Sequence, residues 1–232
     1  MGQRKDPLLP ETWYHCYNRG VDKRVIFEDT NDYERFLMLL RACNSVQPVH
    51  ISNFEQSNRS KTLYDVLRVA TEKPLVDIGA YNLMGTHYHL LLREREANGI
   101  TSCMRKIGTA YTMYFNIRRE RTGALFEGAF KAKRISTDQY FDRVLSYIHA
   151  NHAEIVEPNW KVGVIKNEER LKKHLVQYRF SSLPDYSKES RPESVIINKQ
   201  AVFETTEKVS SLGEIIEEAR IYARDNDDST GL

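Results

Sequence analysis

Two neighbouring stretches of extended chain, joined by a very short link, constrain the fold more than any other feature of this sequence. Residues 76–83 and 86–93 both have the apolar and aromatic character of strands, and they meet near Met84-Gly85. Such a link joins antiparallel neighbours, because parallel strands need a crossover of a dozen or more residues. The sequence therefore predicts a pair of adjacent antiparallel strands.

The other predicted elements lie on both sides of this strand pair in the chain. Strands that are not linked by regular helical crossovers favour an antiparallel sheet with helices packed on one face, so the predicted fold class is α+β. The expected elements are a strand at 13–19, a helix from about 30 to 45, an insertion at 47–74 with a short helix near 63–70, a helix at 101–119, an extended segment at 125–135, a helix from 136 or 137 to about 152, a polar helix at 167–176 and a helix at 212–224.

The length of 232 residues favours one full-sized domain with appendages. We expect this domain to span residues 1–186. Residues 187–232 carry six Lys/Arg against ten Asp/Glu, which indicates an acidic tail, partly disordered or helical. Such a tail can screen a basic groove, bind a partner or simply be solvated, and solvation is the default interpretation of a charge run.

The composition indicates a folded protein of the cytoplasm. The chain is 41% hydrophobic and 28% charged, no apolar run approaches the roughly 18 residues that span a bilayer, and the first residues lack the apolar core of a secretory signal. Cys16, Cys43 and Cys103 form no CxxC pair. We therefore predict neither a disulfide framework nor a zinc site, and expect the cysteines to be buried small hydrophobes.

A basic stretch at 102–134 suits a polyanionic partner. It holds eight basic residues against two acids, and aromatic residues lie between them. Basic residues with aromatics can hold a single strand of nucleic acid, although core packing is the expected role for any one aromatic ring. The candidate DNA-binding residues are Arg105, Lys106, Arg118, Arg119, Arg121, Lys131, Lys133 and Arg134, and the aromatic residues are Tyr111, Tyr114, Phe115, Phe126 and Phe130.

Two histidines in the second strand of the pair form a candidate metal site. His87 and His89 are two residues apart, so on a strand they project to one side about 7 Å from each other. Tyr88 between them points to the opposite side. Two imidazoles at this spacing can chelate a divalent ion, but a lone HxH pattern is more often accidental than a metal site.

The helix predicted to end near residue 152 supplies the chemical context. Tyr147 and Asn151 are four residues apart and therefore share one helical face. If this helix packs across the histidine strand, Asn151 can add an oxygen ligand and Tyr147 can reach a phosphate polarised by Mg²⁺ or Mn²⁺. On the pattern alone, Tyr147 is more simply a buried aromatic residue alongside Val144 and Ile148.

Several sequence blocks follow one another in order over about residues 12–186: YHCYNRG at 14–20, IF at 26–27, DYERF at 32–36, MGTHYHLL at 84–91, GALFEGAFK at 123–131, YIHAN at 147–151 and YRFSS at 178–182. This ordered set resembles the REP-associated tyrosine transposases, which are one-tyrosine HUH proteins that act on single-stranded DNA. The resemblance implies a ferredoxin-like sheet, metal ligation by His87, His89 and Asn151, and a 5′-phosphotyrosine link through Tyr147 that leaves a free 3′-OH.

Three features depart from the family pattern. Gly85-Thr86 stands where the family usually has Pro-Asn, His152 stands where it usually has Pro, and the insertion at 47–74 exceeds the usual connection. The first two leave the implied catalytic residues intact, but His152 or Glu154 is then a competing third ligand. The insertion bears on which DNA sequence is recognised.

The sequence thus predicts a metal-dependent endonuclease and strand-transferase acting on single-stranded or hairpin DNA, nucleoid-associated when bound. A DNA-binding or regulatory protein without turnover on the same fold is the main alternative. A third hypothesis is a metal-dependent phosphoesterase that uses water, in which Tyr147 is structural. The family includes dimers and monomers, so a homodimer is one expected assembly.

Overall fold

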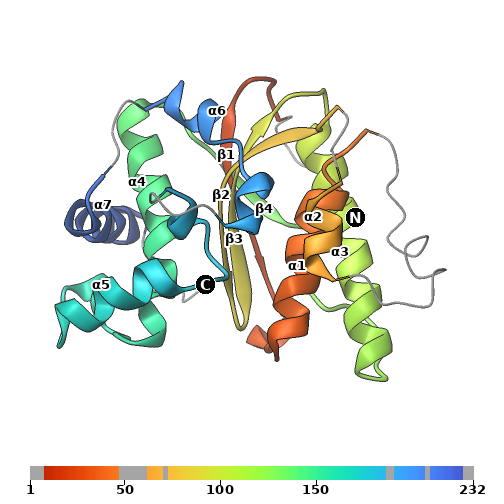
Figure 1. Cartoon of the computed structure of the whole chain (residues 1–232), viewed down its shortest axis with the longest axis horizontal. Helices are drawn as coiled ribbons and strands as arrows, with labels where there is room; N and C mark the ends of the chain where they lie inside the picture. The colour runs from red at the N-terminus through yellow and green to blue at the C-terminus, as the bar shows by residue number, and fades with distance from the viewer. Residues whose placement is uncertain (1–7, 47–61, 70–72, 187–190, 207–209, 227–232) are drawn as a thin grey trace.

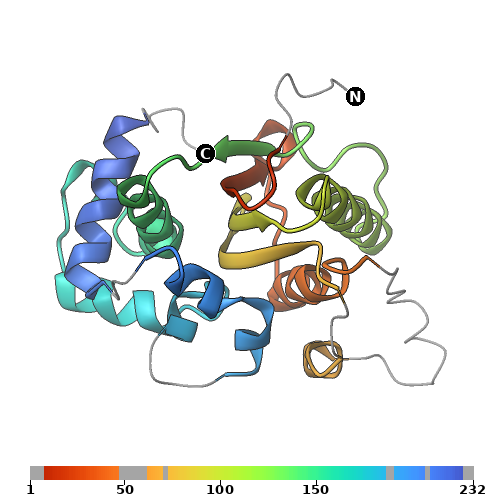
Figure 2. The same cartoon turned by 90° about the horizontal axis from the view of Figure 1, so that it is seen from above.

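The computed structural model describes residues 8–46, 62–69, 73–186, 191–206 and 210–226. A central sheet separates two groups of helices. In Figure 1, helices α1, α2 and α3 lie on one side of it and helices α4, α5 and α7 on the other. Figure 2, seen from above, shows the same three layers.

The sheet of the described chain has four strands in the order β2-β3-β1-β4, and all neighbouring strands are antiparallel. The bounds are Trp13–Arg19 for β1, Val76–Met84 for β2, His87–Glu94 for β3 and Lys131–Arg134 for β4. The strand pair expected from the sequence is confirmed, since β2 and β3 join at Gly85-Thr86 with Met84 opposite His87. The extended segment expected at 125–135 is shorter, because the chain bends around Gly128 before β4 begins.

One face of the sheet carries the larger apolar core. Helices α1 (Thr30–Ala42) and α3 (Gly99–Arg118) cover it. Helix α1 begins after Asp29, whose side chain accepts hydrogen bonds from the first backbone amides of the helix. Every second residue of β1 and β3 points into this core, and Tyr88 packs against Phe36 with ring centroids 4.9 Å apart. Helix α2 (Leu63–Leu67) lies against α1; it is part of the predicted insertion, whose residues 47–61 and 70–72 lie outside the described residues.

The opposite face is covered too, so the prediction that the helices pack on one face is wrong, while the α+β class and the antiparallel sheet are confirmed. Helix α4 (Asp138–Ala150) packs on β2 and β3 from this side. The physical reason lies in β2, which is buried along its whole length and therefore needs cover on both faces. Thr137 caps α4 through a hydrogen bond from the backbone amide of Tyr140.

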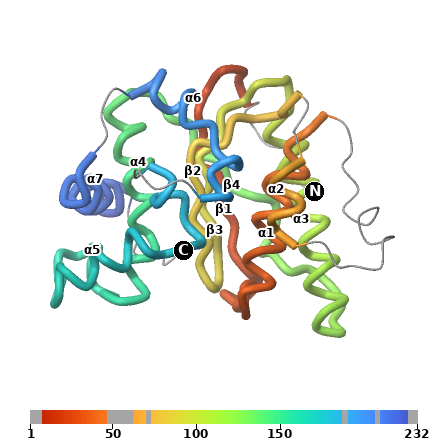
Figure 3. Tube along the Cα trace, in the orientation of Figure 1, coloured from red at the N-terminus to blue at the C-terminus, as the bar shows by residue number. Residues whose placement is uncertain are grey.

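The C-terminal part of the chain wraps around α4, as the blue end of the trace in Figure 3 shows. Helix α5 spans Glu168–Gln177, α6 Lys199–Phe203 and α7 Leu212–Asp225. Helix α7 buries Ile215, Ile216 and Tyr222 in the core that also holds α4. The expectation of a solvated tail is therefore wrong for α7, because its apolar face needs a partner. The domain boundary at residue 186 stays a prediction.

Short 3-10 turns complete the secondary structure of the described chain. The turns are η1 (Val21–Lys23), η3 (Asn151–Ile155), η4 (Trp160–Val162), η5 (Leu183–Tyr186) and η6 (Pro192–Ile196).

Cys16 and Cys103 are buried free thiols, as expected, and Cys43 is half-buried. None of the helices in the described ranges is long and apolar enough to cross a membrane.

Candidate metal and nucleophile site

His87 and His89 lie on the face of β3 that α4 covers. Both side chains are buried, and their ring centroids are 5.1 Å apart. Tyr88 points to the other face, into the core beneath α1. The alternation of a strand thus separates the histidines from the aromatic core, as the sequence predicted.

Helix α4 brings the other two candidate residues to the histidines. Oδ1 of Asn151, the first residue after α4, lies 3.1 Å from Nε2 of His87. The ring of Tyr147 meets the ring of His89 edge-on, with centroids 5.4 Å apart. Nδ2 of Asn82, the residue opposite His89 on β2, donates a 2.6 Å hydrogen bond to the carbonyl oxygen of Ile148, which ties α4 to the sheet.

The two competing ligands lie elsewhere. His152 has its Nδ1 2.8 Å from Nδ2 of Asn82 and its Nε2 3.3 Å from the carbonyl oxygen of Leu175, and its ring stacks on Tyr178. Burial lowers the pKa of His152, which favours the neutral ring. Glu154 forms an ion pair with Lys161 at 3.4 Å. Asn151 is therefore the residue of this segment that lies beside the histidine pair.

The donor atoms fit a divalent cation. Nε2 of His89 is buried and has no hydrogen-bond partner among the described residues, so its lone pair can bind a cation. Burial lowers the pKa of His89 well below its usual range, and the neighbouring His15, His87 and Lys161 lower it further. A neutral imidazole is the form that binds a metal.

The candidate ligands His87, His89 and Asn151 provide two imidazoles and one amide oxygen. No group of three His, Cys, Asp or Glu side chains in the described ranges, this site included, is arranged to hold a metal ion. The third candidate ligand is the amide oxygen of Asn151, so the candidate site differs from a group made of His, Cys, Asp or Glu side chains alone. Mixed nitrogen and oxygen donors of this kind can hold a divalent cation.

Tyr147 is only 1% exposed. The ring of Tyr222 from α7 packs on it with centroids 4.6 Å apart, and the ammonium of Lys161 lies 5.6 Å from its ring centroid. Tyr147 is also part of the core that contains Val144 and Ile148. The structure therefore places Tyr147 both in the core and next to His89, and its role as nucleophile stays a prediction.

The predicted DNA-binding residues are divided between the two faces of the sheet. Lys131 and Lys133 of β4 pair with Tyr17 and His15 of β1, so they point to the face of the histidines. The Lys131 ammonium lies 5.7 Å from the ring centroid of Tyr17. Arg134 is exposed and points to the other face.

The basic residues of α3 lie on the far side of the sheet. Arg118 and Arg119 form ion pairs with the buried carboxylate of Asp32, each at 2.8 Å. Lys106 donates a 2.7 Å hydrogen bond to the carbonyl oxygen of Ser45, and Arg105 is exposed beside it. These residues are remote from the histidines, because the basic stretch 102–134 places α3 on one face of the sheet before the chain returns to the sheet as strand β4.

Arg121 and the aromatic residues of the same run also have local roles. Arg121 hydrogen bonds to Asn116 and to the carbonyl oxygen of Ala124. The aromatic side chains pack in or against the core, which is the role expected for any one of them. Tyr111, Phe115 and Phe126 are buried, and Tyr114 and Phe130 are partly buried against the same core.

Sequence reasoning missed several residues that contact the candidate site. Nε2 of His15 lies 2.9 Å from Nδ1 of His89, and Oγ1 of Thr86 lies 2.9 Å from Nδ1 of His87. Lys161 and Tyr222 contact Tyr147. Alternation along β1 places His15 and Tyr17 on one side, but only the strand order shows that this is the side of the histidines.

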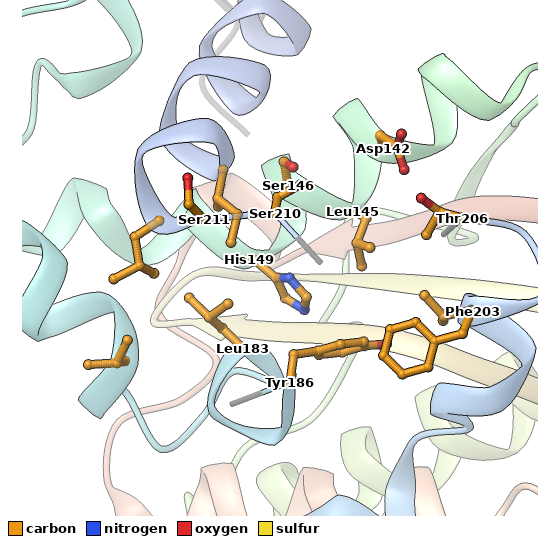
Figure 4. Close-up of a pocket in the computed structure, with 14 residues that line it drawn as sticks. Asp142, Leu145, Ser146, His149, Leu183, Tyr186, Phe203, Thr206, Ser210 and Ser211 are labelled. Atoms are coloured by element: carbon orange, nitrogen blue, oxygen red, sulfur yellow. The ribbon is translucent and has the colours of Figure 1, made fainter. Parts of the chain in front are cut away.

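A separate hollow lies on another side of α4, between this helix and the C-terminal segments. Figure 4 shows His149 and Tyr186 turned toward it, together with Leu145 and Phe203. Nε2 of His149 lies 3.1 Å from Oγ of Ser182, and burial lowers the pKa of His149 to about 3. The lining is mainly apolar, so the hollow belongs to the packing of α4 against the C-terminal region.

Comparison with known proteins bears on this geometry. Residues 51–151 match the family model of the IS200-like transposases, so the resemblance seen in the sequence is confirmed over a segment that contains His87, His89, Tyr147 and Asn151. No curated protein sequence is significantly similar to the chain. A solved structure of a REP-associated tyrosine transposase bound to a REP hairpin is 14% identical with a TM-score of 0.45, over 79% of this chain and 84% of that one.

Proposed function

We propose that this protein is a metal-dependent single-strand DNA endonuclease and strand-transferase that forms a 5′-phosphotyrosine intermediate through Tyr147. One observation carries the proposal: two strand histidines, a helical asparagine and a helical tyrosine meet at one buried place from β3 and α4. The match to IS200-like transposases over residues 51–151 supports it. The substrate is single-stranded DNA, with a hairpin beside the cleavage site.

His87, His89 and Asn151 would hold the ion through the two Nε2 atoms and Oδ1. When bound, the ion supplies positive charge that polarises the scissile phosphate. Burial keeps the His89 ring neutral and so ready to ligate, as its lowered pKa indicates. Packing of α4 on the sheet, helped by the bond from Asn82 to the Ile148 carbonyl, keeps Asn151 beside His87.

Tyr147 would act as nucleophile. Its phenol oxygen forms a bond to phosphorus as it loses its proton, the bond from phosphorus to the 3′ oxygen breaks, and that oxygen takes up a proton to become a free 3′-OH. One phosphodiester is exchanged for another, so a different 3′-OH can reverse the step and join the strand elsewhere. This exchange accounts for strand transfer without an external energy source.

Cations on the same side of the sheet can guide the DNA. Lys161 lies over the Tyr147 ring, and Lys131 and Lys133 project from the edge strand β4 on the histidine face. The side chain of Lys131 lies near the ring of Tyr17, which pairs a phosphate-binding group with an aromatic surface. These three lysines are the better phosphate contacts, in place of Arg118 and Arg119.

Access to Tyr147 must involve a movement. Since the side chain is 1% exposed and covered by Tyr222, DNA can reach its hydroxyl only after Tyr147 or part of α7 changes position. The observed cleavage rate would then include this opening step. The same burial is what favours the second candidate function, a DNA-binding protein without turnover on the same fold.

A covalent-trapping assay tests the proposal. The protein is incubated with labelled single-stranded hairpin DNA and Mn²⁺ or Mg²⁺, and a denaturant-resistant protein–DNA adduct is sought. We expect the adduct in the wild type and its loss in Tyr147→Phe, because the phenyl ring has no nucleophile. Tyr140→Phe is the matched control, since it removes a hydroxyl from the same helix, where Tyr140 is only partly buried.

Each other outcome selects an alternative. Tight DNA binding with no adduct across a broad hairpin library would favour the non-catalytic binding protein. Cleavage that persists in Tyr147→Phe would favour a nuclease that uses water.

A further inference from the structure

We propose that His15, anchored by Tyr222 of α7, is a positioning residue that holds the His89 ring with its proton on Nδ1 and its Nε2 lone pair free for a cation. The inference rests on the proposed metal site and extends it. It assigns a role to a residue of β1 and to the C-terminal helix, two parts of the chain that supply none of the proposed ligands.

Two buried hydrogen bonds carry the inference. Nε2 of His15 lies 2.9 Å from Nδ1 of His89, and Nδ1 of His15 lies 3.0 Å from the hydroxyl oxygen of Tyr222. The two imidazole rings are stacked, with centroids 5.0 Å apart. All three side chains are nearly inaccessible to solvent, at 0–5% exposure, so a change of partner would leave a buried polar atom unsatisfied.

The chain of bonds can run in either of two directions. In the first, Nδ1–H of His89 donates to His15, and Nδ1–H of His15 donates to the Tyr222 hydroxyl. In the second, the Tyr222 hydroxyl donates to His15, Nε2–H of His15 donates to His89, and the His89 proton sits on Nε2.

The environment of His89 Nε2 favours the first direction. Among the described residues this buried atom has no hydrogen-bond partner. In the second direction it would be an N–H donor with nothing to receive its hydrogen and with no lone pair for a cation. In the first it presents a lone pair, which a metal ion satisfies.

His87 differs in a way that makes the role of His15 specific. Its Nδ1 meets the hydroxyl of Thr86, which rotates and can donate or accept. Nε2 of His87 lies 3.1 Å from Oδ1 of Asn151, an acceptor, which favours a proton on Nε2 while no cation is bound. The contacts of His87 therefore do not favour a proton on Nδ1, in contrast to those of His89. For His89, the partner is a second imidazole. Nε2 of His15 accepts from Nδ1–H of His89, and Nδ1–H of His15 is then satisfied by the Tyr222 hydroxyl.

The ¹⁵N NMR shifts of the histidine side chains, measured on the full-length, metal-free protein, test the predicted tautomer of His89 directly. We expect His89 to be neutral with its proton on Nδ1, and His15 likewise. Tyr222→Phe keeps the ring that packs on Tyr147 but deletes the hydroxyl, so it should disturb the tautomer signals of His15 first and those of His89 to a smaller extent. Tyr140→Phe is the control, because Tyr140 contacts the Tyr222 ring from outside the bond chain.

Mn²⁺ affinity, measured by calorimetry, supplies the second readout. His15→Leu should weaken Mn²⁺ binding by about 10–100-fold, the usual effect of losing an outer partner of a metal-binding histidine. His15→Gln should recover much of this loss, because its amide oxygen reaches the position of Nε2 and can accept from His89. The Tyr222→Phe loss should be smaller than that of His15→Leu and in the same direction.

Two results would overturn the inference. One is a His89 proton on Nε2 in the wild type. The other is unchanged Mn²⁺ affinity in both His15→Leu and Tyr222→Phe, with thermal unfolding showing that at least one variant is folded. Neither depends on DNA cleavage, so a protein with the predicted tautomers and no adduct would refute the proposed nuclease and leave the positioning role standing.

Discussion

The two faces of the sheet are built from the same strands but bury different kinds of side chain. Beneath α1 and α3, the strands contribute apolar and aromatic groups such as Tyr88, which packs on Phe36. Beneath α4, the same strands contribute His15, His87 and His89. The first face gains stability from apolar burial, whereas the second combines its own apolar core, which includes Trp13 and Leu91, with polar groups that each need a partner.

The difference identifies the face on which we propose that a cation binds. An unsatisfied buried polar atom costs about 1–3 kcal/mol. Such atoms occur on both sides of the sheet among the described residues, with Nε of Arg35 on α1 and Nε2 of His89 on the histidine face. Nε2 of His89 is the one imidazole nitrogen of this kind in the described ranges, and there we propose that a cation binds.

The largest expected effect is on the apolar face. Phe36 is fully buried between α1 and the sheet, so Phe36→Ala should lower the free energy of unfolding by about 3–5 kcal/mol. Urea denaturation measures this. Ile117→Ala, at a position 77% exposed on α3, is the control and should change stability by less than about 0.5 kcal/mol. Equal losses in the two variants would contradict the assignment of the core.

The next largest expected effect is the stabilisation of the folded protein by Mn²⁺ bound at the histidine face. Mn²⁺ at about 100 times its Kd should stabilise the folded protein by about 2.7 kcal/mol, because the unfolded chain has no assembled site. Thermal unfolding with Mn²⁺ and after chelation measures the shift in Tm. His87→Ala removes one proposed ligand and should abolish the shift, while Phe36→Ala, although less stable, should retain it. A shift of full size in His87→Ala would refute the proposed ligand set.

The smallest expected effect is on the affinity for single-stranded DNA, and it involves the lysines of the edge strand β4. Lys131→Gln and Lys133→Gln should each weaken single-stranded DNA binding a few-fold and reduce the slope of log affinity against log salt by about 0.7, the value for one lost phosphate contact. Fluorescence anisotropy over a salt series measures both. Arg105→Gln, on the face of α3, removes an equal charge remote from the site and should leave the slope unchanged. A larger change in Arg105→Gln would place the DNA on the other face.

Local sequence patterns predicted much of the candidate site. Alternation along a strand placed His87 and His89 together and Tyr88 apart, and helical spacing placed Tyr147 and Asn151 on one face, as the structure has them. The short link at Gly85-Thr86 predicted the antiparallel pair. These features depend on neighbours within a few residues, whose geometry the backbone period fixes.

Other features could not be obtained from spacing. The basic run at 102–134 looked continuous, yet the sheet separates Lys131 and Lys133 from Arg118 and Arg119. The acidic end of the chain looked solvated, yet α7 packs on α4. A one-dimensional charge pattern does not say which face of a sheet each residue reaches.

By itself the sequence determined the strand pair, the two histidines on one side of it and the helical pairing of tyrosine with asparagine. Only the tertiary structure decided that α4 covers the histidine face, that His15 meets His89 from another strand, and that Tyr222 covers Tyr147. These contacts join residues about 70 to 200 positions apart. They depend on strand order and on the need to bury both faces of β2 and the apolar side of α7, which only the complete packing of the chain satisfies.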